Sequence, residues 1–202
     1  MPDQTLSARP LCRSEKAFTD AFIGMLKEMD FDKIRTSEII RRSGFSRGGF
    51  YAQFLDKYDL ADKIVEREVQ FYVQNAIRCV RAVETGCDDA QLLSILADFM
   101  ERVYQKRDLY DIILDSRFPG VTLDDFCRRI RDSLDKKVIT VVPGMDDNLD
   151  FAYHDYADFY GSLVHLKFWR LNGYRISPED MAKKELASIR KQPYRYRFAE
   201  GS

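Results

Sequence analysis

Arginines and lysines gather in one stretch of an otherwise balanced sequence. The chain of 202 residues carries 32 Lys and Arg against 33 Asp and Glu, a net charge of −1. Residues 33–57 hold six basic residues against two acidic ones, a local charge of +4; the basic residues are Lys33, Arg35, Arg41, Arg42, Arg47 and Lys57. Arginine offers a fork of N–H donors to guanine or phosphate, and lysine offers a point charge to phosphate. This stretch therefore predicts contacts with nucleic acid.

Two short helices are expected to position these cations. Thr36 is expected to cap the first, which stops at Gly44, and Ser46 is expected to start the second. The three-residue turn 43–45 with its central glycine is typical of a helix-turn-helix, whose second helix enters the DNA major groove. The side chains expected to pack inward are Ile39, Ile40, Phe45, Phe50 and Phe54. Those expected to face outward are Thr36, Ser37, Arg47, Gly48, Tyr51 and Gln53.

The run from Thr36 to Leu60 resembles the DNA-binding signature of TetR-family transcriptional regulators. The matching positions are Thr36, Ile39, Gly44, Ser46, Gly48, Tyr51, Phe54, Lys57 and Leu60, within a resemblance that covers about residues 14–62. It implies that Thr36, Tyr51 and Lys57 hold phosphates, and that Arg47, Gly48 and Gln53 face bases or the adjoining backbone. The DNA-binding residues expected altogether are Thr36, Ser37, Ser46, Arg47, Gly48, Gly49, Tyr51, Gln53 and Lys57.

Gly49 departs from the family pattern, which usually has a small hydroxyl residue or alanine there. Two successive glycines cost a helix about 1 kcal/mol each relative to alanine. Ala52 is also smaller than the aromatic residue often found at its position. We therefore expect a loose recognition helix that DNA orders, with base preference depending mainly on Arg47.

Helix signals recur along the rest of the chain, whereas strand signals are almost absent. The sequence predicts an all-α fold of nine helices. One is expected at about 15–29 after a cap at Ser14, and two short ones follow Thr36 and Ser46. The other six are expected at about 57–84, 89–107, 109–115, 123–141, 147–172 and 178–191. The expected organisation is an irregular arm at 1–13, a helix-turn-helix DNA-binding domain at 14–60, a helical regulatory and dimerisation domain at 61–192 and a frayed tail at 193–202.

The helix expected at 147–172 is apolar on most sides, so it must be buried on most sides. A second copy of the chain is the expected cover, as the resemblance also implies; a central helix of a monomer is the alternative. The expected homodimer interface consists of Tyr156, Phe159, Tyr160, Leu163, Leu166 and Trp169.

The resemblance further implies a pocket for a small-molecule effector in the helical domain. The candidate lining residues are Phe99, Tyr104, Tyr110, Phe118 and His154, although such aromatic residues also suit a plain core.

The leading hypothesis is a cytoplasmic transcriptional regulator without a cofactor, in this family most often a repressor that a ligand releases from a pseudo-palindromic double-stranded operator. A TetR-like activator or coactivator working through a protein partner is the alternative. An enzyme or a helical interaction module without DNA binding is less favoured. Asp158, Ser162 and His165 share a helix face but lack an oxyanion-hole motif, and no metal-ligand spacing is found. No apolar run approaches a membrane span, and no signal peptide is visible.

Overall fold

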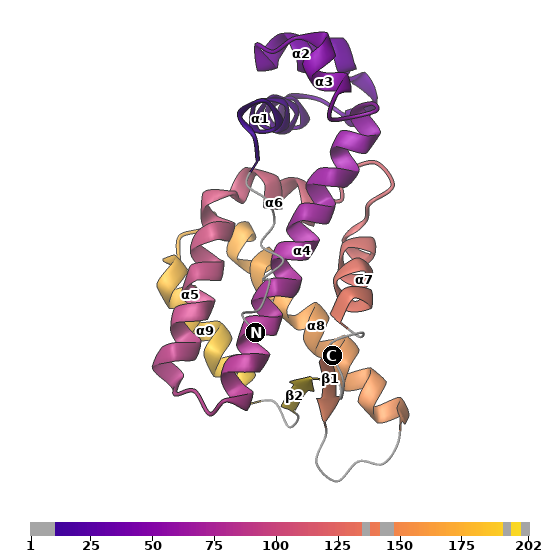
Figure 1. Ribbon diagram of the computed structural model, residues 1–202. Helices are drawn as coiled ribbons and strands as arrows, with labels where there is room; N and C mark the ends of the chain where they lie inside the picture. Colours follow the sequence, from indigo (N-terminus) through magenta and orange to yellow (C-terminus); the bar gives the residue numbers. More distant parts are fainter. Residues whose placement is uncertain (1–10, 135–137, 142–147, 192–194, 199–202) are drawn as a thin grey trace, which may run out of the picture. The chain divides into compact units, whose positions relative to one another are not determined.

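A computed structural model of the chain describes residues 11–134, 138–141, 148–191 and 195–198, and describes side chains for 11–134, 138, 160–191 and 198 (Figure 1). Within these ranges the chain forms nine α-helices, one 3-10 turn and two short strands: α1 (Arg13–Glu28), η1 (Phe31–Lys33), α2 (Thr36–Ser43), α3 (Arg47–Tyr51), α4 (Lys57–Glu84), α5 (Asp89–Gln105), α6 (Arg107–Leu114), α7 (Leu123–Leu134), β1 (Val138–Val141), α8 (Asn148–Leu171), α9 (Pro178–Ile189) and β2 (Arg195–Phe198). The predicted nine-helix fold is confirmed, with one small sheet added.

Local signals determine several helix ends as the sequence predicts. The hydroxyl of Ser46 accepts a hydrogen bond from the Gly49 amide at 3.1 Å and so caps α3. Asp56 starts α4, because its carboxylate accepts from the amides of two residues in the first turn at 2.8 and 2.9 Å. Gly44 ends α2 with φ of 72°, a left-handed conformation that favours glycine.

Two predicted caps are wrong by one or two residues. Helix α1 begins after Cys12 rather than after Ser14, because the carboxylate of Glu15 reaches back to the Cys12 amide at 2.9 Å. Helix α2 begins after Arg35, so Thr36 is its first residue and not its cap.

The chain divides into two compact units, which we call the N-terminal unit (Met1–Phe71 with Ile112–Phe126) and the C-terminal unit (Tyr72–Asp111 with Cys127–Ser202). Phe18 of α1 lies at the centre of the N-terminal unit and is fully buried. Its ring lies 5.2 Å from that of Phe50, 5.8 Å from that of Phe45 and 6.1 Å from that of Phe54. This aromatic cluster fixes α3 against α1.

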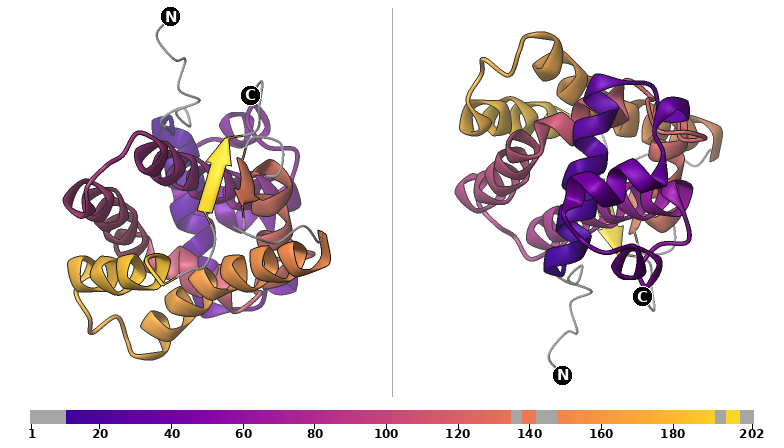
Figure 2. Two further views of the ribbon diagram at one scale, coloured as in Figure 1. Left: turned by 90° about the horizontal axis from the view of Figure 1, so that it is seen from below. Right: turned by 90° about the horizontal axis from the view of Figure 1, so that it is seen from above.

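In the C-terminal unit, α5 and α9 lie side by side (Figures 1 and 2). The end of α8 is held by Trp169, whose side chain is fully buried. Its indole N–H donates to the carbonyl oxygen of Ile176 at 2.9 Å, and its ring packs on those of Tyr104 and Tyr174. The hydroxyl of Tyr174 donates in turn to Asp111 at 2.7 Å, so the connection between α8 and α9 is tied to α6.

The sheet corrects two expectations. A helix was expected over 123–141, but α7 ends at Leu134 and Val138–Val141 form β1. The β-branched sequence Val-Ile-Thr-Val suits a strand better than a helix. Strand β2, in the tail that was expected to fray, pairs antiparallel with β1, so that Val138 lies opposite Phe198.

Candidate nucleic-acid interface

Helices α2 and α3 form the predicted helix-turn-helix around Gly44. Ile39 of α2 and Phe50 of α3 are fully buried, as their inward positions require. On the outer side of α3, Arg47 and Gly48 are exposed. The first residues of helix α3 are therefore exposed to solvent, as those of a recognition helix must be.

Arg47 and Arg35 are the exposed cations without an acidic partner among the described residues of α2, α3 and the turns beside them. The guanidinium of Arg47 lies 5.4 Å from the centre of the Tyr51 ring, and the Tyr51 side chain is itself 47% exposed. Arg35 directly precedes α2 and is also exposed. Arg35 was not among the DNA-binding residues that the sequence predicted, although its charge was counted in the basic stretch.

The charges of Arg41 and Arg42 are largely offset by nearby carboxylates. Glu38 accepts from Arg41 Nε at 2.8 Å and from Arg42 Nε at 3.1 Å, and Arg42 also binds Glu28 at 2.8 Å. The hydrogen bonds from Arg41, and secondly from Arg42, lower the pKa of Glu38 to about 2. Glu38 therefore stays ionised, and the positive potential of the segment depends mainly on the other basic residues.

Lys57, expected at a phosphate, is engaged with the main chain. Its ammonium donates to the carbonyl oxygens of Phe31 at 3.0 Å and Ile34 at 2.8 Å. It also lies 4.2 Å from the centre of the Phe31 ring. An ammonium has three N–H donors, so one remains for a phosphate.

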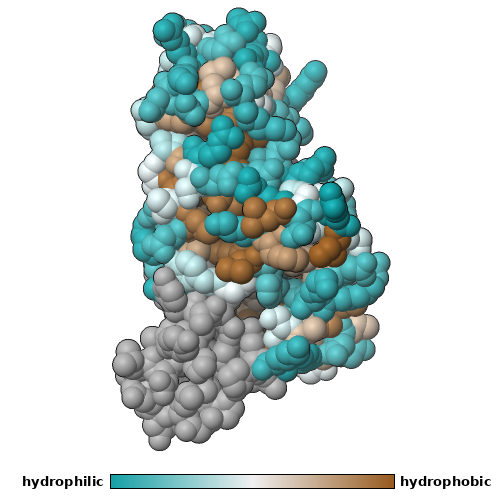
Figure 3. Space-filling view, turned by 180° about the vertical axis from the view of Figure 1, so that it is seen from behind, coloured by the Kyte–Doolittle hydropathy of each residue, from teal (hydrophilic) through white to brown (hydrophobic). Residues whose placement is uncertain are grey.

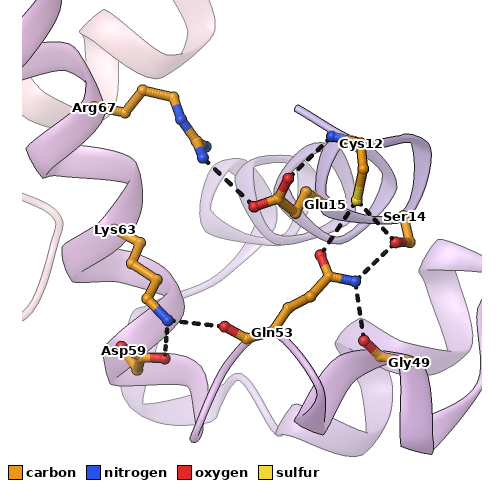
Figure 4. A network of polar contacts seen from close by, with 8 residues as sticks. All are labelled: Cys12, Ser14, Glu15, Gly49, Gln53, Asp59, Lys63 and Arg67. Atoms are coloured by element: carbon orange, nitrogen blue, oxygen red, sulfur yellow. Dashed lines mark hydrogen bonds and ion pairs between the residues drawn. The ribbon is translucent and has the colours of Figure 1, made fainter. Parts of the chain in front are cut away.

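Gln53, expected to face bases, is joined to α1 and α3 by its side chain (Figure 4). Its amide nitrogen donates to Ser14 Oγ at 2.7 Å and to the Gly49 carbonyl oxygen at 3.0 Å. Its amide oxygen faces the thiol of Cys12 at 3.7 Å. Both side-chain donors of Gln53 are therefore used within the protein.

The remaining expected DNA contacts occupy the same surface region with different exposure. Ser37 and Ser46 are exposed, whereas Thr36 and Gly49 are partly buried. The Ser46 hydroxyl already accepts from the Gly49 amide, so its capping role is structural.

The expected ligand residues are not brought together into one described cluster. The ring of Phe99 packs on Tyr72 and that of Tyr104 on Trp169, both within the C-terminal unit. Phe118 packs on Phe22 in the N-terminal unit, Tyr110 is fully buried, and the side chain of His154 lies outside the described residues. An open hollow at the start of α9 has a different lining: Arg175, Ile176, Ser177, Asp180, Lys183, Lys184 and Ala187.

The expected interface residues of α8 differ in their burial within the single chain. Leu163, Leu166 and Trp169 are at most 1% exposed within the single chain. Tyr160 is partly buried, and the side chains of Tyr156 and Phe159 lie outside the described residues. Among the described side chains of α8, those of residues 160–171, the exposed large apolar ones are Val164, Phe168 and Leu171.

His165 and Ser162, two of the three polar residues expected on one face of α8, contact different partners. His165 Nδ1 lies 2.5 Å from Glu185 Oε2 on α9, and this hydrogen bond raises the pKa of His165. The Ser162 hydroxyl lies 3.3 Å from that of Tyr72. No group of three potential metal ligands occurs among the residues that the structure describes. None of the described helices is long and apolar enough to cross a membrane.

Neither the protein-family models nor the sequences of curated proteins give a match. Solved structures do match over most of the chain. A TetR transcriptional regulator from Streptococcus agalactiae has 18% identity and a TM-score of 0.54, with 88% of this chain and 93% of that one covered. The fatty acid degradation regulator FadR from Bacillus halodurans has 11% identity and a TM-score of 0.56, with coverage of 90% and 96%. A TetR-family regulator from Syntrophomonas wolfei has 18% identity and a TM-score of 0.53, with coverage of 88% and 93%. The chain thus has the fold of TetR-family transcriptional regulators.

Proposed function

We propose that the protein is a sequence-specific DNA-binding transcriptional regulator, which binds a pseudo-palindromic operator as a homodimer and leaves it when a small molecule binds. The observation that carries the proposal is the helix-turn-helix, in which α3 is fixed by the buried Phe50 and exposes Arg47 at its start. The TetR-like fold, at 11–18% identity to the solved structures, is consistent with this role.

Docking of α3 in the major groove would bring Arg47 to base edges or phosphates. Arginine forms bidentate hydrogen bonds with guanine, and its charge adds a counterion-release contribution to affinity. A symmetric dimer would place two such helices about 34–36 Å apart, one helical turn of DNA.

The exposed apolar side chains of α8 support the homodimer. Val164, Phe168 and Leu171 are 59%, 50% and 71% exposed, and their spacing of four and three residues places them on one helix face. Figure 3 shows hydrophobic side chains gathered on the face of the molecule that is seen from behind. A two-fold axis beside α8 would bury this face against its own copy.

The effector is the third part of the proposal and rests on the resemblance of the sequence to the family. A ligand releases DNA only if it binds the DNA-incompetent state more tightly. If a protein partner rather than a small molecule acts on the C-terminal unit, the DNA-binding part of the proposal is unchanged.

Selection of random duplex DNA by the purified full chain, repeated over a series of salt concentrations, tests the proposal. We expect enrichment of a pseudo-palindrome whose affinity falls steeply as salt increases. Because a retained ligand could hold the protein off DNA, the same selection is run on protein that has been unfolded, stripped and refolded. Absence of enrichment in both preparations contradicts the proposed function.

A further inference from the structure

The recognition helix α3 is short, and its sequence gives it little stability of its own. It spans only Arg47–Tyr51 and contains Gly48 and Gly49 in succession. Each glycine costs a helix about 1 kcal/mol relative to alanine. Phe50 fixes the buried side of α3, whereas the exposed side of α3 and its C-terminal end need other contacts to order them.

The side chain of Gln53 satisfies a carbonyl group at the end of α3. The Gln53 main-chain amide bonds to the Phe50 carbonyl oxygen at 2.9 Å, as in a tightened last turn. The carbonyl oxygen of Gly49, which a regular helix would bond to that amide, instead accepts from Gln53 Nε2 at 3.0 Å. Gln53 therefore closes α3 with its own side chain.

The same amide nitrogen joins α3 to the start of α1. Its other hydrogen bond, of 2.7 Å, goes to the hydroxyl of Ser14, which is 39 positions away in the sequence. The first turn of α1 is itself fixed, because Glu15 binds the Cys12 amide at 2.9 Å and lies 3.6 Å from Arg67 of α4. Ser14 thus offers Gln53 a rigid acceptor (Figure 4).

The main chain of Gln53 is held from a third side. Lys63 of α4 donates to its carbonyl oxygen at 2.8 Å and to the carboxylate of Asp59 at 2.9 Å. Contacts from α1, α3 and α4 therefore converge on this residue. An amide that reads adenine must present a donor and an acceptor together to the base, and here both donors are used internally.

From this geometry we infer that Gln53 is a positioning residue, which orders α3 against Ser14 of α1 and makes no base contact. The inference rests on the proposed function, and it assigns Gln53 a different part in it from Arg47. It predicts that Gln53 and Ser14 act as one unit, although they belong to different helices.

A double-mutant cycle with the full chain and the selected operator tests this inference. Gln53→Ala and Ser14→Ala should each weaken operator binding by about twofold to tenfold, the range of one net hydrogen bond. The double variant should bind no more weakly than the weaker single variant, because both changes remove the same bond. Ser14→Thr, which keeps the hydroxyl, should bind like the original chain.

Two further readouts separate positioning from base contact and from general destabilisation. Gln53→Ala should leave the salt slope and the preferred base at every operator position unchanged. In the DNA-free protein it should speed hydrogen exchange at amides 49–54 while leaving the buried amides of α1 as protected as before. Additive losses, a changed preference at one base pair, or unchanged exchange at 49–54 would each overturn the inference. If the unaltered chain binds no duplex, the proposed function fails, whereas the exchange experiment still decides whether Gln53 orders α3.

Discussion

The ammonium group of Lys57 lies 2.8 Å from the carbonyl oxygen of Ile34 and 3.0 Å from that of Phe31. A residue at the first position of α4 thereby holds the turn that precedes α2. Charge-assisted hydrogen bonds of this kind are stronger than neutral ones. Lys57 thus has a structural role, whichever contact its third donor makes.

Replacement of Lys57 by alanine should lower the free energy of unfolding by about 2 kcal/mol, because hydrogen bonds to a charged group contribute about 1.5–3 kcal/mol. Urea denaturation of the DNA-free protein measures this change. Lys33→Ala is the matched control, since Lys33 makes an ion pair with Asp30 that is exposed to solvent and contributes little to stability. A Lys57→Ala variant as stable as the control would show that the two carbonyl contacts contribute nothing.

Replacement of Arg47 by alanine should lower the salt slope of operator binding by about one unit and relax the preference at one base pair. Its side chain is exposed and has no charged partner among the described residues, so stability should change by less than about 0.5 kcal/mol. Arg47→Lys should keep the slope and lose the base preference, because lysine lacks the bidentate fork. If Arg47→Ala kept both slope and preference, α3 would dock without Arg47.

Two glycines of the helix-turn-helix should respond to alanine in opposite directions. Gly44 has a φ of 72°, so Gly44→Ala should lower the free energy of unfolding by about 1–2 kcal/mol. Gly48 has no heavy atom within 4 Å of an added Cβ, so Gly48→Ala should raise it by about 0.5–1 kcal/mol. Denaturation curves with equal m-values measure both, and the same sign for the two would contradict these assignments.

Signals that act between residues close in sequence made part of the N-terminal unit predictable. Gly44 as a stop and Ser46 as a cap act within a few positions, so the sequence alone locates the turn and the start of α3. Ser14, which Gln53 contacts, is 39 positions away in the sequence, and the two main-chain acceptors of Lys57 are 26 and 23 positions away. A pattern of residue types and spacings does not reveal such pairings, so the contacts that these two side chains make within the protein were not predicted.

The apolar character of α8 predicted its burial but not its orientation. Leu163 and Phe168 both satisfy an apolar pattern, yet the first is 1% and the second 50% exposed. Which face of α8 is buried within one chain depends on how the other helices pack against it. The sequence of α8 alone does not specify that packing. The same limit applies to Val138–Val141, whose partner strand at residues 195–198 is distant in the sequence.

Introduction of a charge on the exposed face of α8 should separate the proposed dimer. Phe168→Glu would place a carboxylate near the same carboxylate of the second chain and would remove apolar area from the interface. Light scattering should show the mass of one chain instead of two at micromolar concentration. Leu55→Glu adds the same charge at a 79% exposed site in the N-terminal unit and should leave the mass unchanged. Equal masses for both variants would exclude this face from the interface.

The contact of His165 with Glu185 should make stability depend on pH. Since the hydrogen bond raises the folded-state pKa of His165 above its ordinary value near 6.5, the folded protein holds the proton more tightly than the unfolded chain. The resulting stabilisation is complete below about pH 6.5 and is lost as the pH rises through the folded pKa. Urea denaturation at several pH values should show this decline, and His165→Gln should remove it. A decline of the same size in His165→Gln would assign it to another group.

The pairing of Val138–Val141 with Arg195–Phe198 also has a consequence for synthesis of the protein. All segments of the N-terminal unit have been made once Phe126 is translated, whereas the sheet of the C-terminal unit also requires Phe198. At about 5–20 residues per second, roughly 4–14 seconds separate these two points. During that interval every segment of the N-terminal unit has been synthesised, while β1 still lacks its partner strand.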